Sequence, residues 1–191
     1  QPRLQLDGNY LAWMERTGSR MDKLFVCDLT TLESTTVQTF SDSPYGQSDP
    51  SLKNGLLVWA DAGDSADVSQ IFRIRLSQST AVPYSPNTYV HDPQGDESCL
   101  AWLTGHHGVG TDLYCSVNGG PAVLVDSDVI EFGLTEDFIA YGKGERVYIY
   151  FYGKGKTYPI TPERELAQFL GASGGYVVWM DVTSRERDIM K

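Results

Sequence analysis

An all-β fold of repeated four-stranded antiparallel sheets is predicted by three features of this sequence. Short apolar runs bounded by Gly, Pro, Asn and Asp recur throughout the chain, a pattern typical of short strands joined by tight turns. Helical character is weak and is confined to residues 161–166, which begin with a fair N-cap. One apolar run in each repeat ends in an aromatic residue, at intervals of 46, 43, 39 and 38 residues: Trp13, Trp59, Trp102, Tyr141 and Trp179. A repeat of this length is typical of a β-propeller.

The spacing divides this single-domain chain into four complete repeats and part of a fifth. The predicted repeats are residues 1–47, 48–90, 91–130, 131–167 and, for the partial one, 168–191. In a β-propeller each repeat forms a four-stranded blade. The prediction is therefore four antiparallel blades plus a partial fifth, which reaches Lys191 where its third strand would finish.

The first two strands of each repeat are recognised by a short stretch beside Pro or Gly, a polar turn and the apolar run. Residues 48–52 and 91–94 are examples of the first stretch, and Lys53-Asn54-Gly55 is an example of the turn. The second strand is central in the sheet, so its aromatic side chain can fill the wedge between neighbouring blades. A core role is therefore preferred over ligand stacking for all five repeat aromatics.

A polar loop separates the second strand from the third, and a further turn leads to a short outer strand. The third strand is predicted at residues 24–27, 71–74, 113–116, 147–150 and, in the partial repeat, 189–190. The outer strand is predicted at residues 36–39, 80–83, 122–125 and 157–160. Pro83 and Pro159 suit an edge strand, where a missing N–H group does least harm.

The partial fifth repeat leaves three interpretations open. The chain is a fragment of a larger propeller, the ring is open, or a partner completes the sheet edge, which includes self-association through the incomplete fifth blade. The first interpretation is preferred. The sequence begins at Gln1 in mid-pattern without Met or a signal peptide, which indicates a mature or trimmed fragment.

Two stretches resemble the TolB-like repeat, a PD40-like and WD40-like propeller repeat. Residues 48–61 contain Asp-Pro and a Trp-ended strand, and residues 24–33 contain an apolar strand followed by Asp-Leu and a turn. The fourth repeat departs from the pattern, with Phe132-Gly133 in place of Asp-Pro and Tyr141 in place of Trp. The third repeat lacks Asp-Leu at residues 116–119.

The resemblance implies several functions, and the fold alone does not choose among them. TolB-like propellers serve as protein-interaction platforms in cell envelopes and as gating domains in front of serine peptidase domains. Others are polysaccharide lyases or glycan-binding proteins. The resemblance therefore implies an extracellular or periplasmic location and a protein or glycan partner.

Composition excludes some partner classes. The formal net charge of −10 repels phosphate backbones and anionic membrane surfaces, so neither nucleic acid nor membrane binding is expected. No apolar run approaches the length of a membrane span. The hydrophobic content of 41% is that of an ordinary folded protein.

Three cysteines, Cys27, Cys99 and Cys115, cannot form a complete disulfide framework. Cys99 and Cys115 lie on two runs joined by a Gly-rich turn, so a cross-strand bridge is an open alternative. Two buried free thiols are the preferred interpretation.

Metal-binding residue types occur in two loops. His106 and His107 are adjacent in a Gly-flanked loop, but no third ligand accompanies them. Asp61, Asp64 and Asp67 can cage Ca²⁺, although their spacing does not match an EF-hand. A solvated loop is the preferred interpretation in both cases, and no cofactor is predicted.

Sequence motifs for catalysis are absent, including a nucleophile elbow and a phosphate-binding loop. One aromatic stretch on strand 147–150 and beyond is flanked by lysines, and alternation places Tyr148, Tyr150 and Tyr152 on one face. Packing inside the propeller is the preferred role of these tyrosines. The alternative is an interaction surface, for which His106 and His107 are candidates as well. His91 precedes Asp-Pro and suits a turn-stabilising hydrogen bond as well as catalysis.

The sequence thus favours a non-catalytic binding module that presents loops to a protein or a glycan. The alternative is a propeller enzyme or part of one, either a polysaccharide lyase or glycoside hydrolase, or the gating propeller of a serine peptidase. An enzyme would need acidic and histidine side chains to converge at one mouth of the ring.

Overall fold

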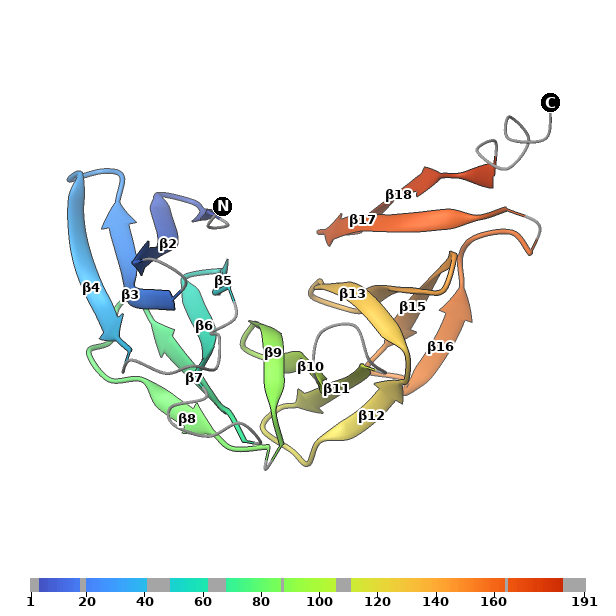
Figure 1. Cartoon of the computed structure of the whole chain (residues 1–191), viewed down its shortest axis with the longest axis horizontal. Helices are drawn as coiled ribbons and strands as arrows, with labels where there is room; N and C mark the ends of the chain where they lie inside the picture. Colours follow the sequence, from blue (N-terminus) through green and yellow to red (C-terminus); the bar gives the residue numbers. More distant parts are fainter. Residues whose placement is uncertain are drawn as a thin grey trace. The chain divides into compact units, whose positions relative to one another are not determined.

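The computed structural model describes residues 4–17, 20–40, 49–61, 68–86, 88–105, 111–163 and 165–183. These residues form 18 β-strands in five sheets, without an α-helix among them. The first four sheets have four strands each, and the fifth has two. The predicted all-β fold of four blades and a partial fifth is therefore confirmed (Figure 1).

The sheets follow the chain in order, and we call them blades 1 to 5. Blade 1 consists of β1 (Gln5–Asp7), β2 (Tyr10–Thr17), β3 (Arg20–Asp28) and β4 (Glu33–Thr39). Blade 2 consists of β5 (Ser51–Lys53), β6 (Leu56–Asp61), β7 (Gln70–Arg75) and β8 (Val82–Tyr84). Blade 3 consists of β9 (Val90–Gly95), β10 (Cys99–Thr104), β11 (Asp112–Val117) and β12 (Val123–Asp126). Blade 4 consists of β13 (Val129–Leu134), β14 (Ile139–Lys143), β15 (Arg146–Phe151) and β16 (Lys156–Pro159). Blade 5 consists of β17 (Ala167–Ser173) and β18 (Tyr176–Asp181).

Each complete blade is a run of hairpins in which consecutive strands pair antiparallel. The strand positions follow the sequence pattern closely, but two strands of blade 1 begin earlier than predicted. The third strand, β3, begins at Arg20, four residues before the predicted start. The outer strand of blade 1 begins at Glu33, three residues before the predicted start. Its extra residues, Glu33, Ser34 and Thr35, are polar and exposed, so the apolar pattern did not reveal them. The predicted third strand of blade 5 lies outside the described residues.

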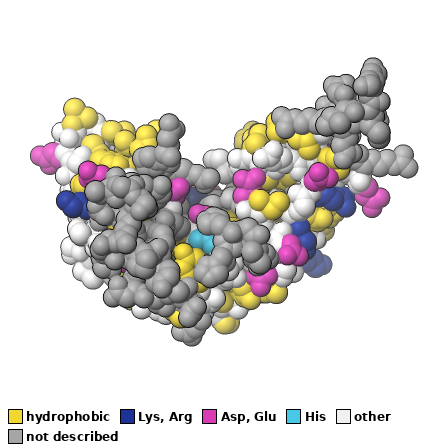
Figure 2. All heavy atoms as spheres, in the orientation of Figure 1, with side chains coloured by type: hydrophobic (Ala, Val, Ile, Leu, Met, Phe, Trp, Pro, Cys, Tyr) yellow, Lys and Arg dark blue, Asp and Glu magenta, His cyan; other side chains and the backbone are white. Residues whose placement is uncertain are grey.

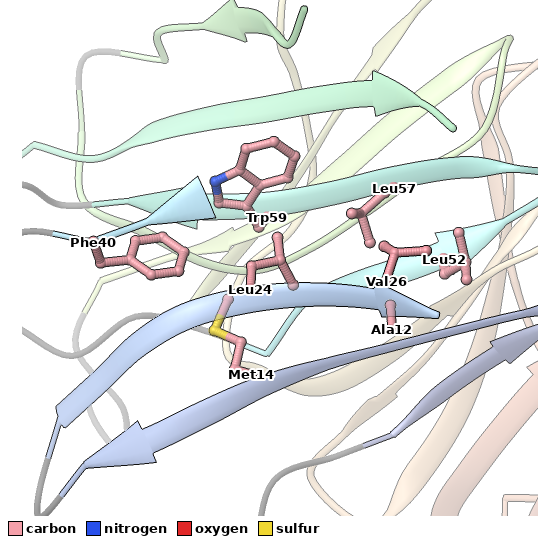
Figure 3. Packing of buried hydrophobic residues seen from close by; sticks show 8 residues of the cluster. All are labelled: Ala12, Met14, Leu24, Val26, Phe40, Leu52, Leu57 and Trp59. Carbon is pink, nitrogen blue, oxygen red and sulfur yellow. The ribbon is translucent and has the colours of Figure 1, made fainter. Parts of the chain in front are cut away.

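The chain divides into two compact units, residues 1–106 with 114–123, and residues 107–113 with 124–191. In the first unit, blade 1 packs against blade 2 through side chains that β2 and β3 point toward β5 and β6 (Figure 3). Met14 and Leu24 meet Leu57 and Trp59 in this core. Burial of such side chains stabilises the unit by roughly 1.5–3 kcal/mol for each large residue.

The same packing recurs at the next blade junction of the first unit and within the second unit. Between blades 2 and 3, Val58 and Ile71 pack with Val90 and Trp102. In the second unit, Val147 of blade 4 packs with Phe169 and Ala167 of blade 5. Gly142 and Gly133 allow this approach, because a Cβ on Gly142 would lie 3.1 Å from Cβ of Phe169 and one on Gly133 would lie 3.1 Å from Ala172.

An aromatic stack across the second and third strands repeats in every complete blade. The ring centroids lie 5.4–6.2 Å apart and the planes differ by 12–17° in four pairs: Trp13 with Phe25, Trp59 with Phe72, Trp102 with Tyr114, and Tyr141 with Tyr148. The residue before each third-strand aromatic is an aliphatic residue with no exposed surface: Leu24, Ile71, Leu113 and Val147. This aliphatic–aromatic pair therefore recurs in the third strand of all four complete blades.

The repeat aromatics differ in burial. Trp59, Trp102 and Tyr141 are fully buried, as a wedge between blades requires, and Trp13 is half-buried. Trp179 departs from the expected core burial, because 37% of its surface is exposed. It lies opposite Phe169 of β17 in the strand register, but no described third strand stacks against it.

Polar links fix the turns of neighbouring blades in the first unit. The β5–β6 turn has positive φ at Asn54 and Gly55, as a two-residue hairpin turn requires. The Gly55 N–H group donates to Oδ2 of Asp7 at 2.7 Å, which joins this turn to the turn of blade 1. Lys53 donates to Oδ2 of Asp96 at 3.2 Å, which joins it to the turn of blade 3.

Candidate functional site

A groove lies between blades 1 and 2 in the first unit, with a volume of about 550 Å³. That volume is within the range of small-molecule and peptide sites. The groove is lined by residues of β2, β3, β4, β7 and the turn after β7: Tyr10, Val26, Asp28, Thr31, Glu33, Thr35, Thr36, Val37, Ile74, Leu76, Gln78 and Ser79.

Unequal outer strands create this groove. In blade 1, β4 pairs with β3 from Thr39 opposite Lys23 to Glu33 opposite Asp28, with a register shift at Val37. In blade 2, β8 pairs only with residues 71–73 of β7. The next residues of blade 2, from Ile74 to Leu76, therefore have no described outer strand beside them, and Ile74 and Leu76 line the groove.

The floor of the groove is apolar. Val37, Ile74 and Leu76 are half-buried and pack against the core between blades 1 and 2. Tyr10 packs against the same core and contributes an aromatic ring to the lining. A ligand that covers such partly exposed apolar side chains removes them from water, which contributes favourable binding free energy.

The rim of the groove is polar and acidic. Asp28 accepts a hydrogen bond from the Thr30 amide at 2.8 Å, and Glu33 donates its amide to Oγ1 of Thr31 at 3.3 Å. These bonds hold the β3–β4 turn and leave the Glu33 carboxylate exposed. None of the described lining residues is Lys or Arg, so the groove carries negative charge. Figure 2 shows acidic, basic and hydrophobic side chains over the first sheet, at the left of the view.

The outer strand β4 is a long and weakly protected sheet edge. Natural edge strands avoid pairing with other chains by being short or by carrying Pro or Lys. The outer strands β8 and β16 follow this rule, with Pro83 in one and Lys156 and Pro159 in the other. By contrast, β4 has seven residues, reads Glu-Ser-Thr-Thr-Val-Gln-Thr and contains neither Pro nor Lys. Only β3 pairs with it among the described strands.

A second groove, of about 390 Å³, lies in the second unit between blade 4 and blade 5. Ile130, Leu166 and Phe169 give it apolar surface, and Glu131 and Glu145 make it acidic. Its described lining residues come from β13, β14, β17 and the turns around them, and none comes from an outer strand.

The three tyrosines predicted to share a face are engaged by packing and hydrogen bonds. Tyr148 stacks on Tyr141, with centroids 5.5 Å apart, and Tyr150 is buried. The Tyr152 hydroxyl donates to the carbonyls of Thr135, at 3.4 Å, and Glu136. Packing therefore accounts for Tyr148 and Tyr150, and an interaction surface at these tyrosines stays a prediction.

A charged cluster in the second unit explains the Tyr at the fourth repeat position. The Tyr141 hydroxyl donates to Oδ2 of Asp126 at 2.8 Å, and Lys143 donates to Oδ1 at 2.6 Å. Burial and the hydrogen bond to Asp126 raise the pKa of Tyr141. Burial alone would raise the pKa of Asp126, but the bonds from Lys143 and Tyr141 lower it below its usual range. The cluster clamps β12 to β14.

The predicted metal ligands fall largely outside the described residues. His106, His107, Asp64 and Asp67 lie there, and only Asp61 is described. Across the described ranges, no group of three or more His, Cys, Asp or Glu side chains is placed to hold a metal ion. Calcium binding at Asp61, Asp64 and Asp67 stays a prediction.

His91 and the cysteines lie in the core of the first unit. His91 is buried, with Nδ1 3.0 Å from Oδ2 of Asp92. Cys99 and Cys115 are buried free thiols, as the preferred interpretation has it, and Cys27 is a half-buried free thiol. The contact with Cys115, together with burial, raises the pKa of Cys99. A buried thiol of raised pKa is a poor nucleophile.

Solved structures with the same fold include propellers of two kinds. No family model and no curated protein sequence matches the chain. TolB from Acinetobacter baumannii superimposes with a TM-score of 0.60 and 14% identity, over 96% of this chain and 52% of its own. This chain has the β-propeller fold of TolB. The β-propeller domain of the Trilobed protease from Pyrococcus furiosus gives a TM-score of 0.64 and 13% identity, over 95% of this chain and 62% of its own.

An intact peptidase has the fold as well. The acylaminoacyl peptidase of Pyrococcus horikoshii gives a TM-score of 0.63 and 15% identity, over 95% of this chain and 35% of its own. The chain thus spans between about a third and two thirds of the solved chains to which it is similar. The described part of the chain contains no helix with the length and hydrophobicity of a membrane span.

Sequence reasoning missed the groove and the β4 edge. The signal that could have found them is the run of residues 33–39, which combines strand-forming Thr and Val with an absence of Pro and Lys. The groove itself had no signal, because its lining comes from residues as distant in sequence as Tyr10 and Ser79.

Proposed function

We propose that this chain is a non-catalytic binding module that holds a partner protein in the groove between blades 1 and 2. The observation that carries the proposal is the groove's composition, an apolar floor continuous with the blade core and a polar rim on a rigid sheet. Binding sites commonly combine a largely apolar surface with a few placed polar groups. The TolB-like fold supports an extracellular or periplasmic location for the module.

A polypeptide is favoured over a glycan by the sheet edge beside the groove. The outer edge of β4 offers a row of backbone N–H and C=O groups, which an extended chain can pair with along its length. A glycan has no comparable repeating donor and acceptor pattern. Among the described lining residues, Tyr10 is the one aromatic on which a sugar ring could stack.

The test is a selection from a displayed library of random peptides, run beside a glycan array on the same purified chain. We expect enrichment of peptides that bind saturably in solution, with no glycan bound more tightly. A result in which neither peptides nor glycans bind would contradict the binding-module proposal. Binding of glycans alone would replace the protein partner with a glycan partner.

A second candidate function is the propeller part of a serine peptidase. Its support is the similarity to the Trilobed protease propeller and to the acylaminoacyl peptidase, which extends over 95% of this chain in each case. In that case a hydrolase domain accompanies this segment in the full-length gene product. Sequencing the gene and labelling the full-length protein with a fluorophosphonate would test this. A gene without a hydrolase domain would rule the candidate out.

A further inference from the structure

The outer strand of blade 1 has the features of a sheet edge that is open to another strand. It is seven residues long, and residues 33–36 are all exposed. Its inner edge pairs with β3 at Thr36 opposite Phe25, Thr35 opposite Val26 and Glu33 opposite Asp28. Strand addition uses the outer row of backbone groups, so it would leave this pairing intact.

The groove lies on one face of the same edge. Thr35 lies opposite Val26 and Glu33 opposite Asp28, so alternation places Thr35 and Glu33 on one face of β4. The register shifts at Val37, which packs against the core on the side of the groove. All three line the groove. A strand added beside β4 would therefore place every second side chain over Ile74 and Leu76 of blade 2.

The negative charge of the groove favours an added strand that carries basic side chains. Asp28 and Glu33 are the ionisable acids of the lining, and no described lining residue is basic. The chain as a whole carries a formal net charge of −10. A long Arg or Lys side chain can lay its apolar stem on Ile74 or Leu76 and present its charge to a carboxylate.

We propose that β4 accepts an extended basic segment of a partner protein as a fifth strand of blade 1. Groove-facing positions of that segment alternate between aliphatic side chains on the apolar floor and Arg or Lys at the acidic rim. This inference rests on the proposed function as a protein-binding module and names the class of partner sequence.

The probe is a symmetric synthetic peptide, acetyl-Thr-Arg-Thr-Val-Thr-Arg-Thr-amide, which places Arg, Val and Arg on one face in either strand direction. Two control peptides accompany it. One replaces both Arg residues with Glu, and the other replaces the central Val with Pro, which removes one N–H group but stays apolar. Binding is followed by NMR titration of the 191-residue chain at low and high salt.

We expect saturable binding of the Arg peptide that weakens with salt. Amide shifts and exchange protection should appear in residues 33–39 and not in β8 or β16. The Glu peptide should bind at least about tenfold more weakly, because it meets like charge at the rim. The Pro peptide should also bind at least about fivefold more weakly, because it lacks a backbone donor.

The variant Glu33→Lys tests the rim, since this side chain is exposed and its exchange should leave the fold intact. We expect an affinity for the Arg peptide about fivefold lower than that of the wild type, and improved binding of the Glu peptide. The matched control is Glu163→Lys, an exposed residue of the second unit with the same change of charge. It should change neither affinity.

Three results of the NMR titrations would overturn the inference. They are equal binding of the Arg, Glu and Pro peptides, equal effects of Glu33→Lys and Glu163→Lys, and protection of β4 by a second copy of the chain without peptide. Library-selected peptides that bind normally to Glu33→Lys would also overturn it, but would leave the binding module standing. If no library peptide binds at all, the proposed function fails first.

Discussion

At the scale of single residues, the Asp96 carboxylate accepts hydrogen bonds from two neighbouring blades. Its Oδ1 accepts hydrogen bonds from the amides of Ser98 and Cys99 and from the Ser98 hydroxyl, at 2.8–2.9 Å. Its Oδ2 accepts from Lys53 of the neighbouring blade. Burial alone would raise the pKa of Asp96, but these bonds lower it below its usual range. The ionised form thus organises the β9–β10 turn and links blades 2 and 3.

We predict that Asp96→Asn lowers the free energy of unfolding by about 2 kcal/mol at neutral pH, because it weakens several charge-assisted hydrogen bonds. The folded pKa lies below the unfolded value, so the unfolded state binds the proton more readily. The stabilisation is fully present above about pH 4 and disappears as the pH falls through the folded pKa. Urea titrations of both proteins at several pH values should show the difference shrinking in acid.

The control for this prediction is Glu97→Gln, the next residue along the turn. Glu97 is exposed and pairs with Arg75, so its substitution should cost no more than about 1 kcal/mol. A larger loss for Glu97→Gln than for Asp96→Asn, or a difference that grows in acid, would contradict the role given to Asp96.

At the scale of strands, the third strand of each blade carries two residues that act together. The first is an aliphatic residue that the neighbouring elements bury completely, and the second is an aromatic that stacks on the second strand. The outer strands carry no such pair and are largely exposed. Stability should therefore depend far more on third strands than on outer strands.

A valine on a third strand and a valine on an outer strand allow a matched comparison. Val147 on β15 is fully buried, and Val123 on the outer strand β12 is 48% exposed. We expect Val147→Ala to lower the free energy of unfolding by about 2 kcal/mol and Val123→Ala to change it by less than about 0.5 kcal/mol. Thermal or urea unfolding measures both, and equal losses would contradict the assignment of the core to the third strand.

At the scale of the whole molecule, blade 5 presents apolar surface that the complete blades keep covered. Tyr176 and Val178 of β18 are strongly exposed, whereas Leu56 and Val58, at the corresponding positions of β6, are buried against blade 3. Exposed apolar surface on a sheet edge favours association with another chain. The predicted self-association through the fifth blade has this physical basis.

We predict that the chain shows a mass above 21.2 kDa in solution as its concentration rises. Tyr176→Lys combined with Val178→Lys should keep it monomeric, because charge on an edge strand opposes pairing. The matched control is Leu32→Lys with Val123→Lys, two exposed apolar residues elsewhere. Sedimentation that shows a monomer at all concentrations, or an equal effect of the control, would contradict this prediction.

Much of the fold could be predicted because strand and turn signals are local. The alternation of apolar runs with Asp, Asn and Gly turns marks hairpins wherever they occur, and the recurring aromatic marks the central strand. The candidate site was harder to predict from the sequence than the fold. Alternation places Tyr148 and Tyr150 of β15 on one face, whereas Tyr152 lies in the turn after this strand, and only packing shows that Tyr148 lies against Tyr141.

The sequence by itself determined the repeating hairpins, the central aromatic of each blade and the acidic character of the chain, because each depends on neighbours in sequence or on composition. Only the tertiary structure decided which surfaces remain open. Trp179 carries the same local pattern as Trp59, yet one is 37% exposed and the other 1%. The groove likewise exists because β8 is shorter than β4, and burial depends on what a distant strand covers.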